Sequence, residues 1–380
     1  METIAIGDAC EVLNGYAFKS EKYTSSGIRI IRIANVQKGY IEDNSPVFYP
    51  IDSDGLDKYM LRENDLLVSL TGNVGRTALL TKDMLPAALN QRVACLRLKT
   101  NKITNGFLFH LLNSNYFESK CIQSSQGVAQ KNMSTEWLKS YELPLYSLSK
   151  QNEITKILDD VRNTIILKEQ ELQKFDELIK ARFIELFIGK GYLTKTIDEV
   201  SLGKGEYGAQ SASIKYDPTR PRYVRITDIN DDGTLNDDVV ASINPDDDEQ
   251  YRLEYGDFLF ARMGATVGKT FTFIAGNQIF AGYLIRYKLN QKLINPRYLF
   301  WYTKLDEYWN WVKLNQSGAA QPGINAKKYG SLRIPVPPIE QQEKFADFVK
   351  QVDKSKFRNF ILHRCQIPPV YAGGITFIYF

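Results

Sequence analysis

The longest regular pattern of apolar and polar residues lies in the middle of the chain. From residue 154 onward, apolar side chains recur at steps of three and four, and no glycine or proline occurs from Gln151 to Phe187. This spacing predicts one amphipathic helix over residues 150–188, about 55 Å long at 1.5 Å per residue. Lys168 and Arg182 fill the two stripe positions that are not apolar. The apolar stripe comprises Ile154, Leu158, Val161, Ile165, Leu172, Phe175, Ile179 and Leu186.

A shorter stretch of the same kind predicts a second helix over residues 339–357. It begins after a pair of prolines, and Phe345, Phe348 and Val352 form its apolar stripe. The tail that follows, residues 358–380, contains a Pro-Pro and a Gly-Gly pair that no helix tolerates. A long stripe needs an apolar partner, so we expect the two helices to pack against each other as a coiled coil. The alternative is that the longer helix lies on the core of a domain.

The remainder of the chain is an internal repeat with an offset of roughly 190 residues, found by matching blocks in the same order. The matching pairs are GIRIIRIANVQKGYI (27–41) with PRYVRITDINDDGTL (221–235), LRENDLLVSLTGNVGRT (61–77) with LEYGDFLFARMGATVGKT (253–270), SQGVAQKNM (125–133) with SGAAQPGIN (317–325), and ELPLYSLSKQNE (142–153) with RIPVPPIEQQE (333–343). The repeat predicts two domains of one fold, residues 1–149 and 189–338, each followed by a helix.

Each copy begins with short alternating segments that predict strands, in the first copy at residues 28–30, 65–70 and 93–98. A brief helical segment follows, at residues 107–117 in the first copy and 296–311 in the second. A proline-marked strand then leads into the long helix. The sequence therefore predicts a mixed α/β (α+β) fold in both domains.

The stretch RMGATVGKTF (262–271) is similar to a nucleotide-binding loop, but its spacing is one residue short of the Walker A pattern. The corresponding loop of the first copy is shorter again and carries arginine in place of lysine. A nucleotide-binding enzyme is therefore a weak alternative. Both copies keep a strand that ends in a glycine-rich turn with one cation, Arg76 or Lys269. Such a turn suits close approach to a phosphate backbone.

Composition narrows the range of possible functions further. Apolar residues make up 43% of the chain and charged residues 24%, with a formal net charge of +4, which permits a nucleic-acid partner without requiring one. The four cysteines are scattered and there are only two histidines, so we expect reduced thiols, a cytoplasmic protein, no metal site and no Ser-His-Asp triad. No apolar run is long enough to span a bilayer. Methyltransferase and nuclease motifs are also missing from the sequence.

The four repeated blocks, in this order, resemble the specificity subunit of type I restriction-modification systems over residues 1 to about 357. The resemblance implies two target recognition domains, each followed by a helix, with the helices paired antiparallel as a spacer. It implies that each domain reads one half of a split, asymmetric sequence in double-stranded DNA, and that the chain itself has no catalytic activity. The implied partners are two methyltransferase subunits and the restriction subunits. S-adenosylmethionine, ATP and Mg²⁺ are expected on those partners, and no cofactor on this chain.

Residues that contact DNA are hypotheses, and for each one the alternative is a structural role. Arg32 and Arg225 occupy equivalent strand positions with apolar neighbours, so we expect them to face away from the core and reach phosphate or guanine. Asn35 and Asp228 follow them, and their difference suits two domains that read different bases, because Asn favours adenine and Asp favours cytosine.

Further candidates lie in the glycine-rich and amide-rich turns. Arg76 and Lys269 are expected on phosphate, and a weaker candidate segment is residues 90–92. The remaining candidates are Asn73, Gln126, Gln130, Lys131, Tyr207, Gln210, Arg262, Thr266 and Gln321. A second function of a different class remains open, a helical adaptor whose doubled domains bind only proteins.

Overall fold

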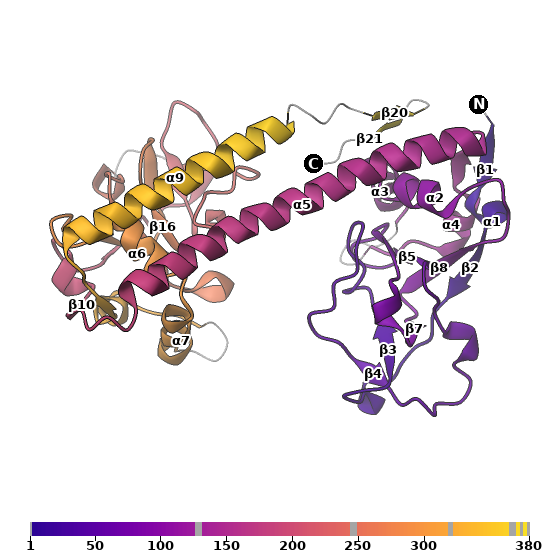
Figure 1. Ribbon diagram of the computed structural model, residues 1–380, viewed down its shortest axis with the longest axis horizontal. Coiled ribbons are helices and arrows are strands. Elements are labelled where there is room, and N and C mark those ends of the chain that lie inside the picture. The colour runs from indigo at the N-terminus through magenta and orange to yellow at the C-terminus, as the bar shows by residue number, and fades with distance from the viewer. Residues whose placement is uncertain are drawn as a thin grey trace. The chain divides into compact units, whose positions relative to one another are not determined.

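The computed structural model describes residues 2–125, 131–243, 249–317, 322–364, 370–372 and 375–377, with side-chain burial described as far as residue 356 (Figure 1). The chain divides into two compact units, residues 1–168 with 365–380 and residues 169–364. Each unit contains one copy of the repeat.

A four-stranded antiparallel sheet forms the centre of the first unit. Its two central strands are buried on both faces for most of their length, which is why they read as continuous apolar runs instead of alternating ones. Leu66 and Val68 face a cluster that includes the helices, whereas Leu67 and Cys95 face a second, smaller sheet. The larger sheet has the order β2 (Cys10–Asn14), β8 (Val93–Leu98), β5 (Leu66–Ser69), β6 (Thr77–Leu79); the smaller has the order β4 (Phe48–Tyr49), β3 (Ile28–Ile31), β7 (Ala87–Leu89).

The second unit has the same topology apart from one additional strand, β12, at the edge of its smaller sheet. In both units the smaller sheet contains one parallel pair, β3 with β7 and β13 with β17. Phe258 and Phe260 face the helices, and Leu259 and Ala261 face the smaller sheet. The larger sheet has the order β11 (Glu206–Tyr207), β18 (Leu284–Lys288), β15 (Asp257–Ala261), β16 (Thr270–Thr272); the smaller has the order β12 (Ser213–Lys215), β14 (Ala241–Ile243), β13 (Arg222–Val224), β17 (Gln278–Phe280). The predicted repeat and the mixed α/β fold are confirmed.

Two short helices in each unit replace the single helical segment that the sequence predicts. The chain breaks between α2 (Asn105–Leu112) and α3 (Asn115–Ser124) because the Ser114 hydroxyl accepts a hydrogen bond from Phe117 N at 3.2 Å and so begins a new helix. The corresponding helices of the second unit are α6 (Pro296–Tyr302) and α7 (Asp306–Asn315).

The first and last strands of each domain are paired. Strand β1 (Thr3–Ala5) is antiparallel to β9 (Glu142–Pro144), and β10 (Thr194–Thr196) is antiparallel to β19 (Arg333–Pro335). A short helix precedes the last strand, α4 (Thr135–Ser140) in the first unit and α8 (Ala326–Gly330) in the second.

Helix α5 spans Leu148–Phe187, 40 residues, close to the predicted limits. The expectation that its whole stripe packs on a partner helix is wrong for Ile154 and Leu158. Both are buried in the core of the first domain, the alternative raised by the sequence. A stripe shows that a helix needs an apolar neighbour, but not which neighbour it meets. Val161, Ile165 and Leu172, further along the stripe, are half-buried.

The C-terminal part of α5 packs against α9 (Ile339–Arg364) within the second unit. Phe345 contacts Phe183 and Phe187 with ring centroids 5.3 and 5.6 Å apart, and Lys356 Nζ lies 2.5 Å from Asp176 Oδ1. Rising numbers on one helix meet falling numbers on the other, so this pair is antiparallel (Figure 1). The residues buried or partly buried in this cluster include Phe175, Ile179, Leu186, Phe348 and Val352.

The pairing also differs from a simple two-helix seam. Phe183 and Phe187 are fully buried, whereas the predicted stripe residue Leu186 only flanks them and Arg182 is exposed. Tyr298 of α6 stacks on Phe183 with centroids 5.0 Å apart and meets the edge of Phe187 at 4.9 Å. The two long helices therefore share a core with α6.

Helix α9 extends to Arg364 and does not end near residue 357 as predicted. Residues 358–364 contain no glycine or proline, so the helix-breaking pairs farther along the tail did not mark its end. At 26 residues α9 is still shorter than α5. In the tail, β20 (Val370–Ala372) and β21 (Ile375–Phe377) form an antiparallel pair.

Candidate nucleic-acid interface

The two glycine-rich loops each connect the strands of a β-hairpin. Val68 pairs with Thr77 across the first loop, and Phe260 pairs with Thr270 across the second. A phosphate-binding loop of the Walker type leads from a strand into a helix, whose N-terminus holds the phosphates. Neither loop enters a helix of that kind, so the nucleotide-binding alternative lacks its structural basis.

Glycine is required near the end of each loop for two reasons. Gly75 and Gly268 have φ angles of 83° and 91°, in the left-handed region that favours glycine. A Cβ at Gly75 would lie 2.7 Å from the Cβ of Cys121, and one at Gly268 would lie 2.9 Å from the Trp309 ring. The repeated glycines thus let the hairpin pack closely on a helix.

The two loop cations bind their own domain. Arg76 donates a hydrogen bond to the Gln37 side chain. Lys269 Nζ lies 2.8 Å from Asp231 Oδ1 and 3.4 Å from Ile229 O. Both cations therefore tie the hairpin to the loop that follows the parallel strand β3 or β13. Their role on phosphate stays a prediction.

The predicted base readers Asn35 and Asp228 are buried, each with 4% of its surface exposed, so that prediction is wrong. Asn35 Oδ1 accepts from Arg32 N at 2.9 Å, and Asn35 Nδ2 donates to Glu42 O at 2.8 Å. Asp228 Oδ2 accepts from Arg225 N at 2.9 Å. A short polar side chain that accepts from the N–H three residues earlier closes a tight turn. Both residues shape the loop from inside.

Arg32 and Arg225 are also held by their own domain, contrary to the expectation that they face outward from a strand. Each follows the end of its strand and is half-buried. Arg32 donates to Ser45 O at 2.8 Å, and Arg225 pairs with Asp228 at 2.8 Å and donates to Val239 O at 2.7 Å. Their guanidinium groups brace the loop after β3 or β13.

Four segments of each domain meet at one edge of the larger sheet, which we call the loop edge. Backbone hydrogen bonds join these segments in the first domain, from Leu70 N to Arg92 O at 3.0 Å and from Gly72 N to Lys131 O at 2.9 Å. The equivalent bonds of the second domain run from Arg262 N to Tyr283 O and from Gly264 N to Pro322 O, both at 3.0 Å. The loop edge comprises residues 14–16, 70–76, 90–92 and 131–133 in the first domain and 207–210, 262–268, 281–283 and 322–325 in the second.

The loop edge brings together part of the predicted set. Exposed side chains there include Asn73, Arg92 and Lys131 in the first domain and Tyr207, Gln210 and Tyr283 in the second, with Arg262 and Thr266 half-buried among them. Tyr283 was missed; its only sequence signal is a large aromatic residue directly after a turn glycine. Gln126, Gln130 and Gln321 lie outside the described residues.

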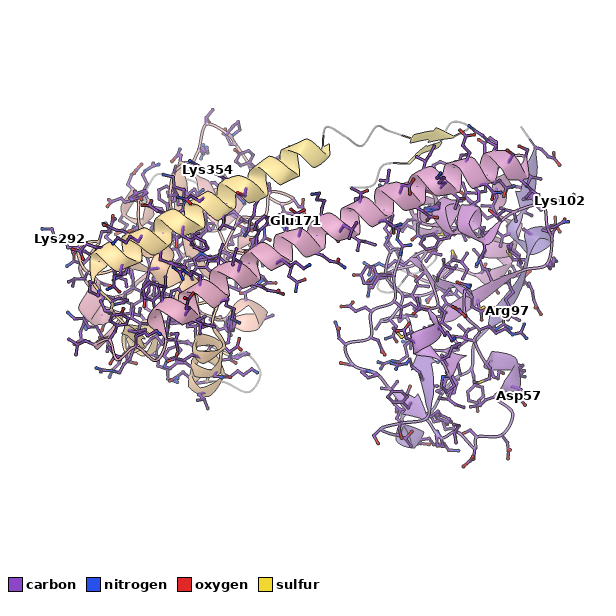
Figure 2. The ribbon with its side chains drawn as sticks, in the orientation of Figure 1. Asp57, Arg97, Lys102, Glu171, Lys292 and Lys354 are labelled. Atoms are coloured by element: carbon purple, nitrogen blue, oxygen red, sulfur yellow. The ribbon has the colours of Figure 1, made fainter. Side chains whose placement is uncertain are left out.

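A buried ion pair fixes the opposite end of the larger sheet in both domains. Arg97, labelled in Figure 2, lies 2.6 Å from Asp65, and the hydrogen bonds that its guanidinium donates to that carboxylate raise the pKa of Arg97. Arg286 lies 3.4 Å from Asp257 and also pairs with Glu206, while burial raises the pKa of Asp257. The aspartates are equivalent in the two copies, but the register makes Arg97 equivalent to Lys288 and Arg286 to Cys95, so each domain supplies the arginine from a different position of its strand.

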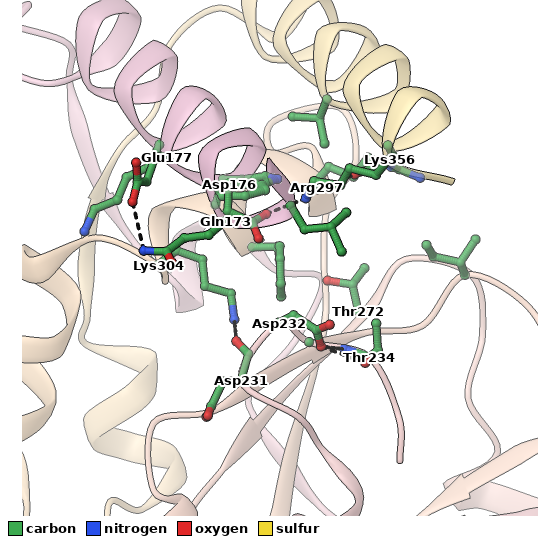
Figure 3. Close-up of a pocket in the computed structure, with 18 residues that line it drawn as sticks. Gln173, Asp176, Glu177, Asp231, Asp232, Thr234, Thr272, Arg297, Lys304 and Lys356 are labelled. Atoms are coloured by element: carbon green, nitrogen blue, oxygen red, sulfur yellow. Dashed lines mark hydrogen bonds and ion pairs between the residues drawn. The ribbon is translucent and has the colours of Figure 1, made fainter. Parts of the chain in front are cut away.

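A groove of about 780 Å³ lies in the second unit between α5, α6, α9 and the loop 231–234 (Figure 3). Lys304 lies over the Phe300 ring at 4.3 Å and donates to Asp231 O at 2.5 Å, and burial lowers the pKa of Lys304 to about 8. The residues that line the groove include none from the described loop edge.

Two other kinds of site were searched for in the described part of the chain. There, no cluster of His, Cys, Asp and Glu has the size to hold a metal ion. No helix of that part is long and apolar enough to cross a membrane.

Comparison with known proteins identifies the family. The family model for the type I restriction modification DNA specificity domain matches residues 1–176 and 191–359. The chain belongs to this family. A specificity subunit is the non-catalytic component of such a system, in agreement with the prediction that this chain is not an enzyme.

Individual relatives agree with the family model. The chain is 34% identical over 168 residues to the EcoAI specificity subunit of Escherichia coli, covering 43% of this chain and 28% of that protein. It is 24% identical over 384 residues to the EcoBI specificity subunit of the same organism, covering 92% of this chain and 78% of that protein. The crystal structure of an S subunit from M. genitalium shares the fold, with a TM-score of 0.51 and 14% identity over 96% of this chain and 92% of that one.

Proposed function

We propose that this specificity subunit reads a split target in double-stranded DNA, with the loop edge of each domain on one half-site. The observation that carries the proposal is that the two loop edges have the same backbone arrangement but differ in their side chains. Equivalent positions follow from the strand registers, because Val68 and Phe260 occupy the same place in β5 and β15. The differing pairs are Asn14 and Tyr207, Leu70 and Arg262, and Arg92 and Tyr283.

This pattern is what an asymmetric target requires. Contacts to the phosphate backbone position a protein without reading sequence, so they can be shared between domains. Base-reading side chains must differ wherever the two half-sites differ. Residues common to both domains, such as the buried Asp65 and Asp257 and the glycines Gly75 and Gly268, lie in the scaffold, whereas the differing pairs lie at the loop edge.

The partners follow from the family and not from a visible contact. The proposed partners are two methyltransferase subunits and the restriction subunits of a type I system acting in the cytoplasm. In this proposal S-adenosylmethionine, ATP and Mg²⁺ bind those partners. The antiparallel packing of α5 on α9 supports the further proposal that the helices act as a spacer between the half-sites.

The test maps methylated positions in a host without other methylation, with this chain and its methyltransferase expressed together. The expected motif has two different half-sites and an unread gap. Salt-dependent, sequence-selective retention of DNA by the purified complex should accompany it. A complex that binds all DNA equally, or binds only protein partners, would overturn the proposal in favour of an adaptor.

The phosphate role of the loop cations is tested in the same system. If Arg76 and Lys269 contact phosphate, replacing either by alanine should weaken binding to all sequences alike and lower the salt slope by about one unit. A change confined to one base position would make them base readers instead.

A further inference from the structure

The strongest difference between the two loop edges is an arginine held on an aromatic ring in the second domain. The guanidinium of Arg262 lies over the Tyr207 ring, 4.8 Å from its centroid. In the first domain the equivalent positions hold Leu70, which is buried, and Asn14. The arginine is therefore not needed to build the fold.

The support beneath Arg262 is rigid. Its backbone N donates to Tyr283 O at 3.0 Å and its backbone O accepts from Ile324 N at 2.9 Å. The Tyr207 hydroxyl in turn accepts from Ala326 N at 3.2 Å, at the beginning of α8. Both the main chain of the arginine and the ring below it are thus fixed before any ligand binds.

Among the described residues of the domain, none accepts a hydrogen bond from the guanidinium of Arg262. Its Nε is buried without a partner among the described residues. In the same part of the structure no ion pair or side-chain hydrogen bond joins Arg262 to a neighbour, in contrast to Arg32, Arg76 and Arg225. A buried donor without a partner is costly, and a ligand that accepts from the same planar group offsets that cost.

We propose that Arg262 is a specificity-determining residue that reads a guanine in the half-site of the second domain. A guanidinium stacked by one face keeps its planar edge free, and that edge matches the O6 and N7 acceptors of guanine in a bidentate contact. The inference rests on the proposed DNA-reading function. A phosphate contact is less suited to this residue, because the first domain has leucine there although both domains face the same kind of backbone.

The experiment measures coupling between the side chain and the base. The complex with the methyltransferase is purified as wild type, Arg262→Lys and Arg262→Ala. The affinity of each complex is measured for the mapped target and for targets in which one G·C pair of either half-site is changed. For the wild type, changing the contacted pair should weaken binding roughly 5- to 150-fold, and for both variants the same change should have no effect. The other half-site should be read unchanged.

Two further variants complete the design. Lys292→Ala is the charge-matched control, since Lys292 is exposed in the turn beyond the far end of β18 (Figure 2) and should leave every base preference intact. Tyr207→Leu removes the ring and should reduce the preference for the contacted guanine. Thermal unfolding and an unchanged first half-site show that the variants are folded.

Several outcomes would overturn the inference. Arg262→Ala could weaken binding equally on all sequences while Arg262→Lys binds like the wild type, and this result would indicate a phosphate contact. Both variants could keep the wild-type preference at every position, or the wild-type motif could lack a G·C pair in both half-sites. In each case the wild type remains sequence-selective, and the proposed function stands. A wild-type complex that binds all DNA equally would instead remove the proposed function and the inference together.

Discussion

Replacing Gln151 by leucine tests how helix α5 is attached to its domain. The side chain is fully buried in the first turns of the helix. Its Oε1 accepts from Thr104 N at 2.8 Å, and its Nε2 donates to Lys102 O at 2.7 Å and Tyr146 O at 2.9 Å. Gln342 makes the same three contacts in the second domain, to Asn295 N, Leu293 O and Pro337 O.

The expected loss follows from these three bonds. Each is worth about 1 kcal/mol net, and leucine also leaves a buried N–H and two carbonyl groups unpaired, so the free energy of unfolding should fall by about 3–5 kcal/mol. At about 2–4 °C per kcal/mol for a unit of this size, the midpoint should fall by roughly 10 °C. Asn152→Leu is the matched control, because Asn152 is the neighbouring amide and is exposed.

Hydrogen exchange followed by mass spectrometry gives the local measurement. Peptides that contain Thr104 should lose protection in Gln151→Leu and keep it in Asn152→Leu, while peptides of the second unit exchange as in the wild type. Equal thermal midpoints and equal exchange for the two variants would refute the reasoning, because the buried amide would then contribute nothing beyond an exposed one.

Three further predictions concern buried groups. Burial raises the pKa of the thiols of Cys10, Cys95 and Cys121, so these groups keep their protons in the folded state and lose them on unfolding above about pH 9. Above that pH the free energy of unfolding, measured by urea titration, should fall by about 1.4 kcal/mol per pH unit for each thiol, and a free energy that does not change with pH would contradict this. Gly268→Ala should lower the free energy of unfolding by about 1–3 kcal/mol more than Gly264→Ala, because both glycines have positive φ but a Cβ has open space only at Gly264 of the two. The thermal midpoint of Gly268→Ala should therefore be the lower one, and equal midpoints would disprove the clash. Arg97→Met should cost about 3–5 kcal/mol by leaving Asp65 charged and buried, and adding Asp65→Asn should recover part of it in chemical unfolding, whereas a further loss would argue against the ion pair.

The repeat, the mixed fold and the limits of α5 were predictable because they depend on local patterns. Helical spacing and continuous apolar runs are properties of a short stretch, and both copies carry them in the same order. The stripe also required an apolar neighbour. It could not distinguish the core of the first domain, where Ile154 and Leu158 lie, from the helix and α6 that cover Phe183 and Phe187.

The candidate site was predicted less well, for a physical reason. A polar residue after a strand reads the same in sequence whether it points to solvent or closes a turn. Asn35 is buried because Glu42 supplies an acceptor seven positions later, and Asp228 is buried beneath its own arginine. The stacking of Arg262 on Tyr207 joins residues 55 positions apart, so no local sequence pattern predicts it.

The paired first and last strands of each domain have a consequence for modularity. The chain enters the first domain along β1 and leaves it along β9, side by side, and β10 and β19 do the same in the second. Everything between these strands is therefore joined covalently to the rest of the chain at one antiparallel junction. We expect that a domain with another loop edge can be exchanged at that junction if it keeps the contacts with Gln151, Ile154 and Leu158 of the helix that follows. Under the proposed function, such an exchange would change one half-site and leave the other as it is.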